Sequence, residues 1–203
     1  YPTPVIGMVG VIEDVEKVVR HAFAEPGDDV VLLGTSTEEI GGSEYLYVTA
    51  GLVAGPPPAV DLAAERALQQ ALLAMAQHGL LRSAHDCSEG GLACALAEAA
   101  LGDGESPLGF AVELDDDLRP VGALFGEAQG RVVVSCAPDK TDEVLRVARR
   151  HDVPARRIGA VTRAEEGMHI RVRNAEVHAT VAEAADVYFG ALPRLMDAPA
   201  ESA

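Results

Sequence analysis

The chain has 203 residues, 48% of them hydrophobic, which is enough for one large domain, or for one domain with part of another. Its formal net charge is −16 at pH 7, so it lacks the clustered cations that a nucleic-acid backbone or an anionic membrane surface requires. Its apolar runs are too short to span a membrane, and its three cysteines form no CxxC pair, which favours a reducing cytoplasm over a disulfide framework.

The pattern of apolar residues predicts strands mixed with helices. In chain order we expect a strand at 5–12, a short helix or turn at 13–23, a strand at 29–33, a helix between Asp61 and Gly79, a helix after Gly91, strands at 110–114 and 131–136, a helix at 141–151, strands at 158–161 and 168–172, and a helix opened by a capping box of Thr180 and Glu183. This order lacks the strict alternation of a doubly wound sheet. It favours an α+β, sandwich-like domain in which helices pack on one face of a mixed sheet.

The start of the chain suggests a piece of a longer polypeptide. The chain opens without Met and runs at once into the apolar segment 5–12, whereas natural N-termini are usually polar and frayed. We therefore infer that the chain is a piece of a longer polypeptide. Residues 15–197 would form the main domain, and residues 198–203 a tail.

The segment richest in chemistry is 84–92. Ser88 can cap the following helix, Glu89 lies in its first turn, and Gly90 and Gly91 remove side chains where it begins. The backbone N–H groups would then face an approaching anion, which the helix dipole favours, and Asp86 could hold Mg²⁺ against phosphate oxygens. The alternative is an ordinary well-capped helix start, which short spacing alone favours.

Other chemistry in this segment is less favoured. His85, Asp86 and Ser88 are too close in sequence to align as a hydrolase triad, whose members converge from distant positions. A histidine bonded locally near the cap is the simpler interpretation. Cys87 and Cys94 supply at most half a zinc site, so we interpret both as small buried hydrophobic residues.

A glycine loop is the second candidate. Gly41 and Gly42 precede Ser43, and two glycines allow a backbone to approach a phosphate or to adopt positive φ. The Lys-Ser/Thr ending of a Walker loop is missing. An ordinary turn before a strand is the alternative, and without further context it is favoured.

The third candidate is the segment 125–131. Glu127, Gln129 and Arg131 lie two residues apart, so on an extended backbone all three side chains face one side and could hold a polar ligand. The alternative is a polar loop that enters a buried strand, with Glu127 and Arg131 as a solvated pair of little energy.

A family resemblance connects these segments. Residues 3–7 (TPVIG), 41–45 (GGSEY), 83–92 (SAHDCSEGGL) and 126–131 (GEAQGR), with the spacer 51–55 (GLVAG), resemble the final portion of phosphoribosylformylglycinamidine synthase. The resemblance covers nearly the whole chain, and 83–92 is its most specific part. This family is similar to other ATP-using synthetases, including aminoimidazole ribonucleotide synthetase, in which each repeat has an ATP-binding domain followed by a C-terminal α/β domain. The chain resembles the second C-terminal domain, which would make residues 1–14 the last strand of an ATP-binding domain.

The resemblance implies an activity for the whole enzyme. It implies an ATP-dependent C–N ligase of purine biosynthesis that amidates formylglycinamide ribonucleotide with ammonia from glutamine, using ATP or ADP and Mg²⁺. The family's catalytic residues lie in earlier domains, so the isolated chain is expected to be inactive and no catalytic residue is assigned. The implied partners are the remaining domains, a glutaminase subunit and a small accessory subunit, and a homodimer of the chain is a further option.

For this chain the resemblance implies an auxiliary nucleotide site. Glu127 and Gln129 resemble a Glu-x-Gln that binds substrate in the family's first C-terminal domain, and by pseudo-symmetry they would face the auxiliary site. Ala128 and Gly130 depart from the more polar residues of that copy, which fits a site without a substrate role. The expected nucleotide-binding residues are Gly41, Gly42, Ser43, His85, Asp86, Ser88, Glu89, Gly90, Gly91, Glu127, Gln129 and Arg131, with Asp86 as the metal ligand.

Two other functions stay open. One is a domain of another ATP-dependent synthetase or kinase of the same superfamily, such as a phosphotransferase of the thiamine-monophosphate kinase type. The other is a pure interaction module, in which the apolar segment 5–12 would be a strand that pairs with a partner's sheet.

Overall fold

The computed structural model describes residues 5–115 and 117–197, and in these ranges seven strands form one mixed sheet in the order β2-β4-β1-β5-β3-β6-β7. The strands are β1 (Asp29–Leu33), β2 (Ser83–Asp86), β3 (Gly109–Leu114), β4 (Val132–Cys136), β5 (Ala155–Thr162), β6 (Met168–Val172) and β7 (Ala175–Ala179). Neighbouring strands are antiparallel except β3 and β6, which are parallel. The expected mixed sheet is confirmed.

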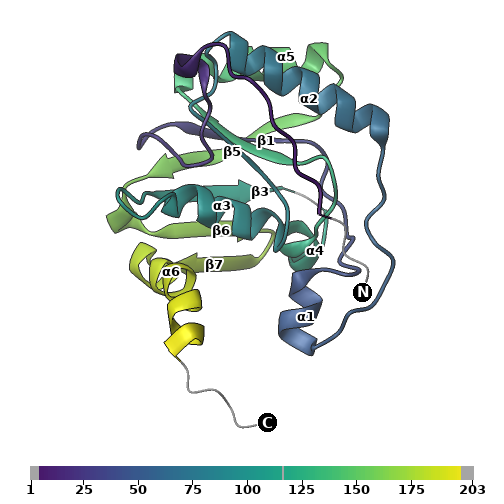
Figure 1. Ribbon diagram of the computed structural model, residues 1–203, viewed down its shortest axis with the longest axis vertical. Helices are drawn as coiled ribbons and strands as arrows, with labels where there is room; N and C mark the ends of the chain where they lie inside the picture. The colour runs from purple at the N-terminus through teal and green to yellow at the C-terminus, as the bar shows by residue number, and fades with distance from the viewer. Residues whose placement is uncertain (1–4, 116, 198–203) are drawn as a thin grey trace.

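Helices connect the strands (Figure 1). The α-helices are α1 (Glu44–Ala50), α2 (Leu62–Gln77), α3 (Gly91–Leu101), α4 (Pro120–Phe125), α5 (Thr141–Arg150) and α6 (Val181–Asp197), and short 3-10 turns are η1 (Val15–Lys17), η2 (Pro138–Lys140) and η3 (Ala164–Glu166). The caps read from sequence are present. Asp61 accepts from the N–H groups of Ala63 and Ala64 at 2.9 and 3.1 Å, and Thr180 and Glu183 form the expected reciprocal capping box.

The helices cover both faces of the sheet, which corrects the expectation of helices on one face. In β1, Val30 and Leu32 belong to the core cluster that includes residues of α3. Val31 and Leu33 point the other way, into a second cluster with residues of α2 and α5. The physical reason is that every residue of β1 is buried, and a strand buried on both faces needs cover on both. Figure 1 shows α2 and α5 together, with α3 over the sheet.

Two helices and two strands of the described ranges were not predicted from the sequence: α1, α4, the short strand β2 and the edge strand β7. None of the residues of α1 is buried, and the side chains of β7 are exposed or half-buried, so neither carries the apolar periodicity that marks an element. The strand predicted at 158–161 is present, and in the structure it extends over residues 155–162 as β5. In the described ranges, no helix is long and apolar enough to cross a membrane.

The predicted strand at 5–12 does not form in this structure. The segment has no regular structure, and its large apolar side chains are between 69% and 103% exposed. A strand is stable only beside a partner strand, and the sheet offers none here. Assignment of this segment to a preceding domain stays a prediction. The predicted tail at 198–203 lies outside the described residues.

Candidate functional site: a carboxylate-lined cavity at the start of α3

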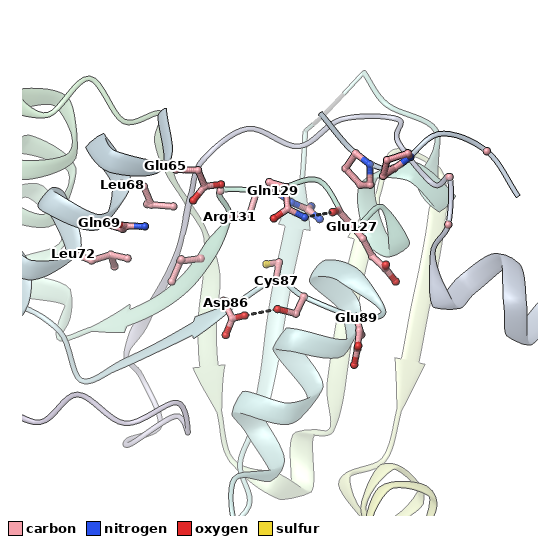
Figure 2. Close-up of a pocket in the computed structure, with 18 residues that line it drawn as sticks. Glu65, Leu68, Gln69, Leu72, Asp86, Cys87, Glu89, Glu127, Gln129 and Arg131 are labelled. Carbon is pink, nitrogen blue, oxygen red and sulfur yellow. Dashed lines mark hydrogen bonds between the residues drawn. The ribbon is translucent and has the colours of Figure 1, made fainter. Parts of the chain in front are cut away.

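Three segments that are far apart in the sequence meet around one cavity of about 550 Å³ (Figure 2). The end of β2 contributes residues 86–89, and the glycine loop before α1 contributes its two glycines. The loop before β4 contributes Glu127, Gln129, Gly130 and Arg131. Eight of the twelve expected site residues line the cavity: Gly41, Gly42, Asp86, Ser88, Glu89, Glu127, Gln129 and Arg131. The sheet order brings the two loops together. β2 and β4 are antiparallel neighbours, and Asp86 at the end of β2 pairs with Val132 at the start of β4.

The other four expected residues do not line the cavity. Ser43 is the N-cap of α1, where its hydroxyl donates to the carbonyl of Ile40 at 2.7 Å. His85 precedes Asp86 in β2, so its side chain points to the opposite face, with Nε2 3.3 Å from a carboxylate oxygen of Glu98 in α3. Gly90 and Gly91 are buried behind the cavity wall.

The amides at the start of α3 are bonded within the chain. The N–H of Gly90 donates to Glu127 Oε1 at 2.9 Å, and the N–H of Gly91 donates to the carbonyl of Ser88 at 3.0 Å. The expectation that Ser88 caps this helix is wrong: the N-cap is Gly90, and the Ser88 hydroxyl donates to Asp86 Oδ2 instead. The reason is geometric: Gly90 and Gly91 both have positive φ, so the chain turns after Ser88 and the helix starts only at Gly91.

Glu127 joins two other segments. Besides the Gly90 bond, its Oε1 accepts from the N–H of Glu44, the first residue of α1, at 2.9 Å. One carboxylate oxygen therefore holds the start of α1 and the start of α3 at the same point. The solvated Glu127–Arg131 pair weighed from the sequence is wrong in one respect, because Arg131 is buried.

Arg131 is a buried structural residue, with 2% of its surface exposed. Its guanidinium donates to the carbonyl oxygens of Gly126 and Ala128 and to the hydroxyl of Ser36. These bonds fix the loop that carries Glu127 and Gln129. Arg131 also lines the cavity, and these three bonds direct guanidinium N–H groups at the protein.

The cavity is rich in acceptors. Carboxylates of Glu65, Asp86, Glu89 and Glu127 line it, with the amides of Gln69 and Gln129 among them. Figure 2 shows the α2 side chains facing the segment that precedes α3. The α2 contribution was not predicted from the sequence, since Glu65 and Gln69 carry no signal beyond the polar side of an amphipathic helix. Such a wall repels bare phosphate and suits hydrogen-bond donors.

The predicted magnesium ligand lacks companions. Asp86 Oδ2 already accepts from Ser88, and the part of the chain that the structure describes contains no group of three or more His, Cys, Asp or Glu side chains placed to hold a metal ion. Since Mg²⁺ takes octahedral oxygen ligands, the residues present do not fit a magnesium site of their own.

Cys87 is a small buried residue, as expected, whereas Cys94 is only half-buried. Burial raises the pKa of the Cys87 thiol to about 11, although it lines the cavity wall. Burial also raises the pKa of Cys94. A thiol that stays protonated near neutral pH is a poor nucleophile and a poor metal ligand.

Much of the chain matches a known protein family. Residues 25–171 match the family described as AIR synthase related protein, C-terminal domain. Curated relatives named phosphoribosylformylglycinamidine synthase subunit PurL include those of Moorella thermoacetica, 51% identical over 159 residues (78% of this chain, 21% of the relative), and Alkaliphilus metalliredigens, 40% identical over 197 residues (97% and 26%). The chain thus spans about a quarter of the length of these relatives.

Solved structures agree with this match. Thermotoga maritima PurL complexed with ATP aligns with a TM-score of 0.66 and 28% identity, covering 84% of this chain and 28% of that one. Its complex with ADP gives 0.67 and 27%, with 84% and 27% covered. A thiamine-monophosphate kinase from Stenotrophomonas maltophilia, 21% identical, shares the fold. The family match covers most of the chain, and the chain therefore belongs to the AIR synthase related proteins, as a C-terminal domain of that family.

Proposed function

We propose that this chain works as the C-terminal domain of a phosphoribosylformylglycinamidine synthase, an ATP-dependent ligase of purine biosynthesis in the cytoplasm. The reaction joins ammonia from glutamine to formylglycinamide ribonucleotide. The observation that carries the proposal is the meeting of three family-like segments around one cavity, in a chain 51% identical to part of a protein named for that activity.

The domain supplies structure and a binding wall, and the reacting groups come from the rest of the enzyme. The one cysteine on the cavity wall, Cys87, is buried and has a raised pKa, and the histidine of the same segment, His85, faces away. The aligned regions make up 22% and 21% of two of these relatives, which leaves room for catalytic domains. The isolated chain is expected to be inactive.

The cavity is proposed to contact an auxiliary nucleotide through its sugar and base. Ribose hydroxyls and an adenine amino group are donors, and the carboxylates of Glu65, Asp86 and Glu89 are acceptors that could receive them. The phosphates and any Mg²⁺ would face residues of other domains, because the amides of Gly90 and Gly91 are bonded internally. Support for a nucleotide comes from the PurL structures with ATP and ADP.

The proposed partners are the remaining domains of the same polypeptide, with glutaminase and small accessory subunits beyond them. A structure of PurLQS from Thermotoga maritima, 28% identical over the aligned part, supports an assembly of this kind. The helix α6 carries Tyr188, Leu192 and Leu195 at 49%, 70% and 73% exposure. Covering such a row of apolar side chains would stabilise an assembly.

A domain exchange tests the proposal. The corresponding region of the Moorella thermoacetica relative is replaced by this chain, and ATP-dependent amidation of formylglycinamide ribonucleotide by ammonia is measured. We expect an active chimera, an inactive isolated chain, and loss of activity with Gly91→Val, since a side chain at Gly91 would collide with the carbonyl oxygens of Gly126 and Leu124. A folded but inactive chimera, or ATP turnover by the isolated chain, would contradict the proposal.

A further inference from the structure

Two histidines face each other on the last two strands of the sheet. His169 in β6 and His178 in β7 are direct partners in the antiparallel register, and their ring centroids lie 5.7 Å apart. Side chains at opposite positions of an antiparallel pair project from the same face, with Cβ atoms about 5 Å apart. The backbone pairing itself therefore holds the two imidazoles beside each other.

The histidine pair lines an open, polar cavity on the sheet. This cavity of about 600 Å³ is formed by residues of β3, β5, β6 and β7, and both histidines belong to its lining. It shares no lining residue with the cavity at the start of α3. Both histidines are exposed, so an ion and its water ligands can reach the two rings.

The two nitrogens of His169 have different surroundings. Nε2 lies 2.8 Å from the carbonyl oxygen of Glu166, which can only accept, so Nε2 carries the proton and donates it. In the neutral ring Nδ1 then keeps a lone pair. Metal-bound histidines show the same arrangement, in which the other ring N–H donates to a backbone carbonyl and fixes the ring. His178 makes no hydrogen bond within the described residues, so its ring can turn to bring a nitrogen towards Nδ1 of His169.

The spacing and the charges around the pair suit a single cation. Zn²⁺ binds an imidazole nitrogen at about 2.0 Å, which places the centroids of two rings on one tetrahedral ion roughly 5 Å apart. The observed separation of 5.7 Å is close to this value. The Glu176 carboxylate lines the same cavity. Glu183 is also near: its pKa is lowered first by hydrogen bonds from Thr180 and then by the neighbouring His178.

A second pair of histidines has similar spacing but lacks available nitrogens. The rings of His21 and His85 have centroids 5.6 Å apart and meet edge to face. Both nitrogens of His85 already face acceptors, since Nδ1 lies 2.8 Å from the carbonyl oxygen of Asp86 and Nε2 lies 3.3 Å from a carboxylate oxygen of Glu98. His85 therefore has no nitrogen left for an ion shared with His21, and this pair provides a matched control.

We propose that His169 and His178 form a binding site for Zn²⁺, which ties the edge strand β7 to β6. The two imidazoles supply nitrogen ligands and water fills the other positions, because the described residues contain no group of three or more His, Cys, Asp or Glu placed to hold a metal ion. Imidazole suits Zn²⁺, whereas Mg²⁺ prefers oxygen ligands. In the sheet β7 has β6 as its one neighbour and leads into α6, so the ion would stabilise the attachment of both elements. The site is independent of the proposed function.

A zinc titration of the full chain, followed by NMR of the histidine ring nitrogens, tests the site. At neutral pH the nitrogens of His169 and His178 should shift together along one saturating curve, and Mg²⁺ should leave them unchanged. His178→Gln should weaken zinc binding by about tenfold or more, since loss of an outer partner of a ligand can already cost that much. His21→Gln is the matched control and should leave the affinity unchanged. Unchanged zinc affinity in His178→Gln, or zinc-induced shifts at His21 and His85 instead, would overturn the site.

Hydrogen exchange gives a separate readout of the tie between the two strands. Saturating Zn²⁺ should slow exchange in residues 175–179 of β7 in the wild-type chain and have no effect there in His178→Gln. Residues 44–50 of α1, which has no buried residue and takes no part in the site, should exchange at the same rate with and without zinc. Zinc binding at the two rings without slower exchange in β7 would contradict the tie. Equal slowing in α1 would also contradict it, because the ion would then act away from the histidine pair.

Discussion

Glu127 accepts a hydrogen bond from the backbone N–H of Gly90 at 2.9 Å, 37 residues earlier in the chain. A carboxylate of the protein thus occupies the position at the start of α3 where an incoming anion would bind. The helix dipole stabilises this internal anion as it would a phosphate. Gly90 and Gly91 at this position are needed for packing within the chain, so substitutions there should change its stability.

Gly91→Ala should destabilise the domain by roughly 2 to 4 kcal/mol. The new Cβ would lie 2.6 and 2.8 Å from the carbonyl oxygens of Gly126 and Leu124, and Gly91 has a φ of +67° that disfavours a side chain. Backbone oxygens cannot rotate away. Urea unfolding of the variant measures the loss, and a change below 1 kcal/mol would show that the two loops can separate.

Gly90→Ala offers the contrasting case. Its Cβ would meet a side chain, the sulfur of Cys94 at 2.3 Å, at a φ of +75°. Cys94→Ala should therefore rescue part of the Gly90→Ala loss and leave the Gly91→Ala loss unchanged, which a double-mutant cycle in urea detects. Equal coupling of Cys94 to both glycines would contradict the assigned contacts.

Arg131→Lys should cost about 2 to 4 kcal/mol, because one ammonium group cannot replace the several donors of the buried guanidinium. The comparison is Arg171→Lys: Arg171 is an exposed partner of Glu113, so this substitution should cost much less than Arg131→Lys. Thermal unfolding of both variants provides the test. Similar small losses at the two positions would show that Arg131 does not fix the loop.

Asp28→Asn should stabilise the domain at pH 7 by something on the order of 1 kcal/mol. Burial raises the pKa of Asp28 despite the opposing charge of Arg82, and within the described ranges its Oδ2 has no hydrogen-bond partner. A raised pKa in the folded state means that the neutral form favours folding, and this contribution is lost as pH rises through that pKa. The gain should vanish below about pH 4, where both variants are neutral.

Urea unfolding of Asp28→Asn and of the wild-type chain, from pH 7 down to below pH 4, tests this prediction. Arg82 keeps a second partner, Glu25, at 2.8 Å, so the substitution should not leave it uncompensated. A loss of stability at pH 7 that disappears as pH falls would contradict the prediction, since it would mean that the Asp28–Arg82 pair outweighs the burial of the charge.

Acid should loosen the base of the loop at residues 34–61. The N–H of Ala59 and then the Thr37 hydroxyl lower the pKa of Glu39 below its ordinary value of 4.5. Because the folded-state pKa is depressed, the bond contributes fully above the unfolded pKa and is lost as pH falls through the folded one. The Ala59 amide shift in NMR should titrate with a midpoint below 4.5, and Glu39→Gln should abolish that transition. A midpoint at or above 4.5 would exclude the bond.

Local rules predicted much of the fold. The caps at Asp61 and Thr180 depend on neighbours three residues away, and the strands at 29–33 and 168–172 follow from runs of apolar residues. The segments around the cavity were also found, because each carries glycines or a dense set of polar groups.

The features that could not be predicted depend on partners that are distant in the sequence. The side chain of Glu127 bonds to Glu44, 83 positions away, and nothing near either residue indicates the pairing. Arg131 turns inward because a loop, and not a strand, precedes it. The segment 5–12 has the composition of a strand, yet no neighbouring strand pairs with it, so composition alone could not decide its structure.

The most direct measurement is an NMR titration of the full chain with pyrophosphate and with adenosine, following the amides of Gly90 and Gly91. With Glu127 in place, pyrophosphate should leave both amides unshifted, whereas adenosine should shift the side-chain amides of Gln69 and Gln129. In Glu127→Ala the Gly90 amide should respond to pyrophosphate, which shows that the position was filled from within. A saturable pyrophosphate shift of Gly90 and Gly91 in the wild-type chain would contradict the account.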